Sequence, residues 1–317
     1  MPVAVQSSFN TNPAYSGTFI PTIWSGKLNV KFYATTVFGE IANTNYEGDI
    51  KNIGDKVIVN NIPSISINNY TVGQTLTYEV PTPSKVEMNI DKAKYFGVNV
   101  SDVLEYQSQP KLMDMFTNDA AKQMAINIDR DVLLNSFNDP VAANKGSGAG
   151  TQSGAFNLGT DNVPVVLSAS NVVQIVTSLA SVLDEQNVPD TDRWLVITPY
   201  MRNVLMSSPL AQAFVTGDSQ SILRNGKIGT IDRFTIYVSN LLPKADAGKD
   251  FAGANQSGAA KRTAIMAGHK SAISFASQIA KVESLQNPND FGTLVRGLNV
   301  YGYETLKPEA LALALVA

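Results

Sequence analysis

The chain has 317 residues, a formal net charge of −3, and 16% charged against 44% hydrophobic residues, a size that favours more than one lobe. Because it has no cysteine and a single histidine, disulfides, thiolate chemistry and metal sites built from several thiolates or histidines are excluded. The balance of 24 basic against 27 acidic residues argues against a dedicated reader of nucleic acid.

Residues 1–40 are expected to form an amino-terminal arm. Asparagine, proline and glycine interrupt them repeatedly, and their apolar residues follow no clean period. A short helix over 24–38 is weakened by Gly26 and Asn29. An arm this aromatic must lie on another surface, of its own chain or of a neighbour. The sequence contains no signal peptide pattern and no apolar run of about 20 residues, so we expect no membrane partner.

Residues 48–100 have the period-2 alternation of half-buried strands. Glu79 is the one charged residue between Val57 and Ser84. Two interpretations remain open for this stretch: an antiparallel hairpin packed on its own domain, or a long arm lying across a neighbouring subunit. The second interpretation is supported by the marginal stability of isolated hairpins in water and by the tendency of uncharged strand edges to pair with other chains. The alternating apolar residues are Val57, Val59, Ile65, Ile67, Val86, Met88, Ile90, Phe96, Val98 and Val100.

The clearest helix is expected over 111–137, which contains no proline or glycine. At about 1.5 Å per residue it would be about 40 Å long. Pro110 precedes it, and Asn-Asp-Pro at 138–140 ends it. Core packing explains its apolar stripe without a cofactor, and the stripe recurs every four residues at Leu112, Phe116, Ala120, Met124, Ile128 and Val132.

Residues 141–163 are expected to form a glycine-rich loop. Its Lys-Gly-Ser-Gly-Ala-Gly run superficially resembles a phosphate cradle. However, no strand leads into the run, no Gly-Lys-Ser/Thr follows it, and no helix opens directly on it. The physical requirements of a nucleotide-binding loop are therefore not met.

A second, mixed lobe is expected from about residue 160. Ser170 is assigned as the cap of a helix that ends near Leu183, a buried strand follows at 194–197, and Thr198-Pro199 begins another helix. The fold class is α+β. The remaining elements are expected in this order: a strand at 233–238, a loop at 243–261, a strand at 264–268, a strand or short helix at 271–279, and strands at 292–303 and 311–315 that return to the first lobe.

The titratable residues yield no enzyme motif. His269 is expected in a turn with its ring bonded to the backbone; the adjacent Lys270 and Ser271 admit a nucleophile hypothesis, but no Gly-x-Ser-x-Gly elbow is present. Basic residues are dispersed, with the densest stretch at 224–233, which allows only a weak, non-specific contact with nucleic acid.

Three carboxylate pairs are candidate sites. Asp129 and Asp131 should face away from each other on a helix, and Asp184 with Glu185 should be solvated at a helix end. The remaining pair, Asp190 and Asp192, lies in a loop without the spaced ligands of a calcium site.

Several stretches, by their order and spacing, resemble the major capsid proteins of tailed double-stranded DNA bacteriophages. The likeness covers most of the chain from about residue 24 onward, and no single motif in it is diagnostic. The stretches that carry it are LDEQNVP at 183–189, RWLVITP at 193–199, AIMAGHKSAISFA at 264–276, QIAKVE at 278–283, FGTLVRGLNVYG at 291–302 and PEAL at 308–311.

This resemblance implies the shell-forming fold that tailed phages share with herpesvirus capsid floors and encapsulins. It implies no substrate turnover and no cofactor. Some members of the family crosslink their subunits covalently, but the sequence identifies no crosslinking pair, and we expect no fused, cleaved scaffold. Carried onto this chain, it predicts an amino-terminal arm at 1–40, an extended loop at 41–90, a first part of a peripheral domain at 91–159 with a spine helix over 111–137, an axial domain at 160–265, and a second part of the peripheral domain at 266–317.

The same resemblance implies a virion component assembled in the host cytoplasm. Its partners would be further copies of the chain, in hexamers and pentamers of an icosahedral shell, with a portal, scaffolding or decoration proteins, and packaged DNA contacted without specificity. A low-charge, asparagine-rich surface fits contacts that close into rings. The candidates for inter-subunit contact, chosen by their place in the arm, the loop and the basic stretch, are Phe19, Trp24, Lys56, Tyr70, Val72, Leu76, Tyr78, Arg224 and Arg233.

Three alternatives are kept. An encapsulin-like compartment shell would have the same fold but a groove for cargo peptides and no genome. An adhesin or fibre module with a β-rich arm would stay a small oligomer. An enzyme using His269 and a carboxylate would lose its activity, and not its assembly, on His269→Gln substitution.

Overall fold

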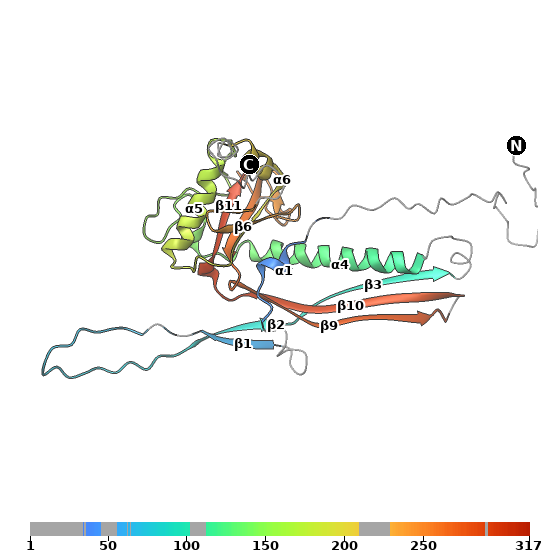
Figure 1. Cartoon of the computed structure of the whole chain (residues 1–317), viewed down its shortest axis with the longest axis horizontal. Coiled ribbons are helices and arrows are strands. Elements are labelled where there is room, and N and C mark those ends of the chain that lie inside the picture. The colour runs from blue at the N-terminus through green and yellow to red at the C-terminus, as the bar shows by residue number, and fades with distance from the viewer. Residues whose placement is uncertain are drawn as a thin grey trace, which may run out of the picture.

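The computed structural model describes residues 34, 36–45, 56–61, 63, 65–101, 112–208, 229–288 and 291–317. These residues form two lobes, from which a thin hairpin extends to one side (Figure 1). The arm through residue 33, most of the helix expected over 24–38, and the contact candidates Phe19, Trp24 and Arg224 lie outside the described residues.

One lobe is a three-stranded antiparallel sheet with a long helix beside it (Figure 1). The helix, α4, spans Leu112–Ser136 and confirms the prediction over 111–137. On the central strand, Tyr301 donates its hydroxyl to Asp131 Oδ2 of α4 at 2.9 Å, and Tyr303 donates to the Asp131 carbonyl at 3.2 Å. These bonds hold the helix on the sheet, whose order is β3 (Lys92–Ser101), β10 (Gly292–Thr305) and β9 (Ile273–Gln286).

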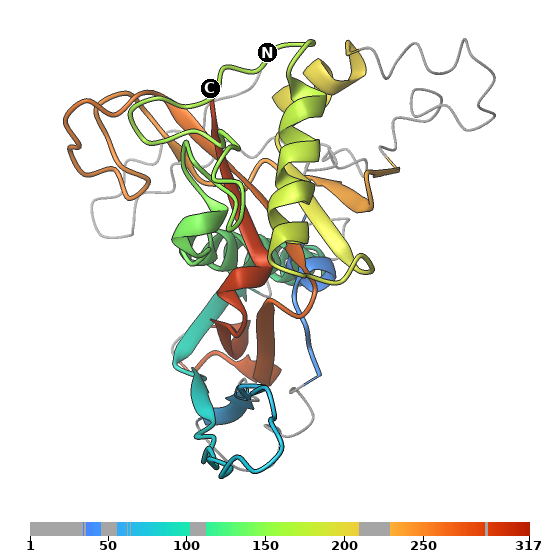
Figure 2. The same cartoon turned by 90° about the vertical axis from the view of Figure 1, so that its left-hand side faces the viewer.

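The other lobe is built on a six-stranded mixed sheet covered by helix α5, Val172–Glu185 (Figure 2). Helix α6, Pro199–Met206, follows its central parallel strand. The apolar face of α5 and the buried strand residues form the main core. The sheet follows the path β11 (Leu311–Val316), β8 (Arg262–His269), β4 (Arg193–Ile197), β6 (Phe234–Val238) and β5 (Thr230–Ile231), with β7 (Lys244–Ala245) paired to β8.

The prediction that the last strand returns to the first lobe is wrong. Strand β11 pairs antiparallel with β8, so that Leu311 lies opposite Gly268 and Val316 opposite Thr263. Between β10 and β11, a short 3₁₀ helix at Pro308–Ala310 redirects the chain into the six-stranded lobe. All residues of β11 are buried, which its Leu-Ala alternation did not reveal. The expected boundary between 265 and 266 likewise falls inside β8.

The assignment of Ser170 as a helix cap is also wrong. Asn171 occupies the cap position of α5, and its side chain bonds backwards instead of into the helix. Its Oδ1 accepts from the Ser168 amide at 2.8 Å, and its Nδ2 donates to the Val166 carbonyl at 2.8 Å. The side chain therefore closes the preceding turn, while Ser170 Oγ lies 3.0 Å from Ser168 Oγ.

The cap predicted at Thr198 is confirmed, because its Oγ1 accepts from the Met201 amide at 3.2 Å and Pro199 begins α6. We expect Thr198→Ala to lower the free energy of unfolding by about 1 kcal/mol, the usual loss of a helix cap. Urea denaturation of the isolated subunit measures this. Thr177→Ala is the control, since that exposed hydroxyl bonds only within α5. Equal effects of the two substitutions would contradict the capping role.

A short segment after the arm packs on the lobe of the three-stranded sheet. Helix α1, Phe38–Ile41, lies against α4, where the buried Asp129 accepts from the Val37 amide at 3.1 Å and from the Phe38 amide at 3.0 Å. Beyond α1, Asn43 forms a bridge to β9, donating its amide to the Ile273 carbonyl at 2.8 Å. Asp129 and Asp131 thus bond to different elements, which confirms that they face apart on the helix.

Among the described residues, no helix combines the length and the apolar character that a membrane crossing requires.

Candidate assembly surfaces

The hairpin is the most exposed apolar surface in the described part of the chain. At its base, β1 (Lys56–Asn61) pairs antiparallel with β2 (Ser84–Asn89), and Met88 packs beneath it against Ala276. Beyond this base, residues 65–83 form no strand, contrary to the period-2 prediction at Ile65 and Ile67. The interpretation of a hairpin packed on its own domain therefore holds only for the base.

The outer hairpin exposes nearly all of its apolar side chains. Ile67 is 93% exposed, Val72 is 96% exposed and Tyr78 is 88% exposed, and Tyr70 and Leu76 are exposed too. Four of the predicted contact residues thus lie together on this one extension, Tyr70, Val72, Leu76 and Tyr78. For the fifth residue predicted in this region, Lys56, the structure describes only the backbone at the start of β1.

The end of the hairpin, residues 71–74, is a tight turn, here called the tip. The Gln74 amide donates to the Thr71 carbonyl at 3.1 Å, and the Thr71 amide donates to the Gln74 side chain at 3.2 Å. Gly73 has φ +88°, a conformation that favours glycine. Nearer the base, Glu79 accepts from the Ser66 amide at 3.1 Å across the hairpin. The tip therefore presents Val72 on a defined turn.

Arg233 belongs to an ion-pair network within its own chain. Its Nη2 lies 2.7 Å from Asp184 Oδ2 and its Nη1 lies 2.8 Å from Asp190 Oδ1. The hydrogen bond with Asp184 is the main cause of the raised pKa of Arg233. Asp184 is solvated as expected, with its side chain 39% exposed, and it also pairs with the buried Arg193 at 2.7 Å. Glu185, too, is bonded: it accepts from the Gln152 amide at 2.8 Å.

His269 has the role expected of a structural turn residue. It ends β8, and its Nδ1 accepts from the Ser271 amide at 3.1 Å and lies 2.8 Å from Ser271 Oγ. Burial lowers its pKa, which leaves the ring neutral near pH 7. In the part of the chain that the structure describes, no group of three or more His, Asp or Glu side chains could hold a metal ion.

The three-stranded sheet has one face that mixes apolar and charged groups. Tyr95 on β3 is 84% exposed, and Leu298 beside it is partly exposed. On the same face, Glu283 bonds Arg296 Nη2 at 2.7 Å and also pairs with Lys281. This surface, here called the open face, thus carries charges at its centre.

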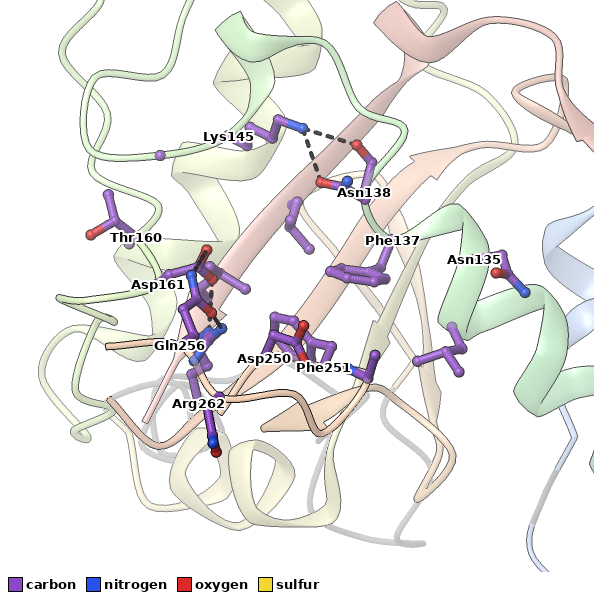
Figure 3. Close-up of a pocket in the computed structure, with 17 residues that line it drawn as sticks. Asn135, Phe137, Asn138, Lys145, Thr160, Asp161, Asp250, Phe251, Gln256 and Arg262 are labelled. Carbon is purple, nitrogen blue, oxygen red and sulfur yellow. Dashed lines mark hydrogen bonds and ion pairs between the residues drawn. The ribbon is translucent and has the colours of Figure 1, made fainter. Parts of the chain in front are cut away.

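A cavity of about 680 Å³ lies where the carboxyl end of α4 meets the six-stranded lobe (Figure 3). Its apolar wall includes Leu134, Phe137, Phe251, Leu313 and Leu315. Phe251 packs against Phe137 with ring centroids 4.6 Å apart. The cavity is therefore lined by apolar groups from both lobes.

The charged groups that line the cavity already have partners. Arg262 pairs with Asp161 at 2.7 Å and stacks over the Phe251 ring at 4.7 Å. Lys145 donates to the Asn138 carbonyl at 2.9 Å, and Asp250 Oδ1 accepts from the amides of Ala252 and Ala254. The cavity is consequently suited to an uncharged group.

Sequence reasoning missed this cavity because segments far apart in the chain build it. The one available signal was Phe251, the single aromatic residue in a loop of small and charged residues at 243–261. Nothing local indicated its partner, Phe137, which lies just after α4.

Comparison with known proteins finds similarity to phage proteins both in sequence and in fold. A family model described as phage capsid protein matches residues 85–314, whereas no curated protein matches the chain. A structure from Mycobacterium phage Che8 is similar with a TM-score of 0.73 and 25% identity, covering 95% of this chain and 98% of that one. The capsid of cyanophage P-SCSP1u is similar in fold, with a TM-score of 0.67 and 17% identity, over 93% of this chain and 92% of that one. The mature capsid of bacteriophage PhiM1 is also similar in fold, with a TM-score of 0.66 and 14% identity, over 93% of this chain and 91% of that one.

Proposed function

Because this chain belongs to the phage capsid protein family, we propose that it is a major capsid protein that assembles into hexamers and pentamers of an icosahedral head around double-stranded DNA. Its α+β fold is that of tailed-phage major capsid proteins, with an extended β loop, a peripheral domain containing a long spine helix, and an axial domain. The protein is a structural component of the virion.

The outer hairpin is the observation that carries the proposal. Exposed apolar side chains along residues 65–80 gain nothing in the single subunit, and large exposed apolar surfaces mark interaction sites. In a shell, each subunit is surrounded by further copies of the same chain, and such a copy can cover the exposed hairpin. We therefore assign Tyr70, Val72, Leu76 and Tyr78 to contacts between subunits, with Lys56 at the hairpin base. For Arg233, the proposed contact involves its guanidinium together with the Asp184 and Asp190 carboxylates that it pairs with.

The two lobes correspond to the proposed domains with shifted boundaries. We assign the arm to 1–40 and the extended loop to 41–90, as the sequence suggests. The peripheral domain takes β3, α4, β9 and β10, while the axial domain takes the six-stranded lobe, including the whole of β8 and β11. The shift follows the strand pairing, since a strand belongs with the sheet that buries it.

The remaining partners follow from the proposed role. A head of this kind needs a portal, and scaffolding or decoration proteins assist many shells. Contact with packaged DNA is non-specific, which fits a net charge of −3 and dispersed basic residues. Assembly takes place in the host cytoplasm. The family match and the similar structures are of phage capsids, which favours a viral shell over an encapsulin-like compartment, and over an adhesin or an enzyme.

Negative-stain electron microscopy of the purified chain, alone and co-expressed with its neighbouring gene products, tests this function. We expect closed shells, or rings of five and six subunits. A monodisperse monomer or dimer under every condition would overturn the proposal. Shells that contain protein cargo and no DNA, when isolated from the natural host, would favour the compartment alternative.

A further inference from the structure

The subunit has an exposed apolar turn and, in a different place, a cavity with apolar walls that could receive the turn of another copy. The tip of the hairpin presents Val72 on a tight turn without covering it. The cavity between the lobes offers apolar walls. Within one chain they do not meet, because both views place the end of the hairpin well away from the six-stranded lobe (Figures 1 and 2).

We propose that the tip of one subunit inserts Val72 into the cavity of a second copy of this chain. The inference rests on the proposed function, because it requires neighbouring subunits. A cavity of about 680 Å³ exceeds one valine side chain and leaves room for a flanking residue such as Tyr70. The bonded turn at Thr71 and Gln74 lowers the entropy lost on insertion, since the tip is already shaped.

The charges favour this pairing. No charged side chain lies on the hairpin between Val57 and Glu79, and Glu79 already accepts from the Ser66 amide. In the cavity, Arg262 is buried and paired with Asp161. Insertion of an apolar tip therefore leaves Arg262 paired with Asp161, while Lys145 and Asp250 keep their hydrogen bonds to neutral groups.

The open face is the competing site, and its chemistry is less suitable. There, Arg296 and Lys281 surround Glu283 on the exposed sheet surface. An apolar tip placed on them would remove these ions from water without offering any new bond, which costs free energy. The cavity offsets the covering of its ions with a wall of apolar side chains, Leu134, Phe137, Phe251, Leu313 and Leu315.

Cysteine trapping tests the proposal directly, because the natural chain contains no cysteine. Val72→Cys is combined with Asn255→Cys, a position exposed on the cavity rim. Cysteine behaves as a small hydrophobe and should therefore sustain docking. In oxidised shells we expect a ladder of covalent multimers on non-reducing gels. The matched control combines Val72→Cys with Tyr95→Cys on the open face, and we expect it to remain monomeric on the same gels.

A second measurement leaves the tip unchanged. A benzophenone amino acid at position 255 is activated by light in assembled shells, and the crosslinked product is digested with trypsin. The hairpin is recovered as the peptide 57–85, because no lysine or arginine interrupts it after Lys56 until Lys85. We expect this peptide to be the main partner.

Electron microscopy of the same samples separates the two levels of inference. Intact shells in which the tip crosslinks to position 95, or in which peptide 57–85 is absent from the products at position 255, would overturn the docking while leaving the proposed function intact. If the natural chain forms no shells under any condition, the proposed function fails and the docking fails with it.

Discussion

Replacing Ile67, Val72 and Tyr78 together with serine is expected to abolish shell formation while leaving the subunit folded. These three side chains are almost fully exposed in the single chain, so their loss removes little from its core. The melting temperature of the unassembled subunit should shift by less than about 2 °C. If the outer hairpin contacts a neighbouring subunit as proposed, the same side chains are buried in a shell, and each contributes about 1.5–3 kcal/mol. The combined loss weakens each contact by about a thousandfold or more.

Sedimentation and negative-stain microscopy measure the outcome. The matched control replaces Val163, Val166 and Tyr200 with serine, which removes apolar side chains that are 57–70% exposed from the six-stranded lobe. We expect the control to form shells. If both triple variants assemble as the natural chain does, the outer hairpin is not the assembly surface. If the hairpin variant unfolds, its side chains support the subunit itself, contrary to their exposure.

Asp129 is expected to make the subunit less stable as pH rises. Its carboxylate is buried without a cationic partner among the described residues, and burial raises its pKa to about 6 despite the two amides it accepts from. The folded state therefore binds the proton more tightly than the unfolded state, whose carboxyl titrates near 3.8. The stabilisation is complete below the unfolded pKa and is lost as pH rises through the folded pKa. From about pH 4 to about pH 7 the loss amounts to about 2 kcal/mol.

Asp129→Asn removes this titration. The difference in free energy of unfolding between the variant and the natural chain should move in favour of the variant as pH rises, as measured by urea denaturation of the unassembled subunit. Glu185→Gln provides a control of opposite sign. Bonds from the amides of Gln152 and Ser153 lower the pKa of Glu185, so its contribution is lost as pH falls. An Asp129→Asn difference that does not change with pH would contradict the assignment.

The titration of Asp129 also affects how firmly the segment after the arm is held on α4. Val37 and Phe38 are held on α4 by the same carboxylate that titrates. A state in which this segment is released exposes Asp129 to water and returns it toward its ordinary pKa. Acid therefore favours the held state over the released one. Hydrogen exchange at residues 36–45 of the natural chain, compared with Asp129→Asn, reports this equilibrium.

Elements whose signals are local could be predicted from the sequence alone. The spine helix was located to within one residue at each end, because an uninterrupted apolar stripe ends at prolines on both sides. Thr198 and Pro199 identified the start of α6, since a cap and a fixed φ act within a single turn. The uncharged stretch after Val57 indicated a hairpin-like region, although its sequence left open whether it packs on its own domain or lies across a neighbouring subunit.

Contacts between segments far apart in the chain could not be predicted from the sequence. The Leu-Ala alternation of β11 fits either lobe, and pairing with β8 settled its place. The sequence shows Asp129 only as a polar residue on a helix, and its role follows from its bonds to the amides of Val37 and Phe38. Likewise, the sequence shows Phe251 only as an aromatic residue in a loop, and its role follows from its contact with Phe137. The physical reason is common to all three. Local sequence sets backbone conformation, whereas a strand's partner, a buried charge and a cavity wall depend on contacts between residues far apart in the chain.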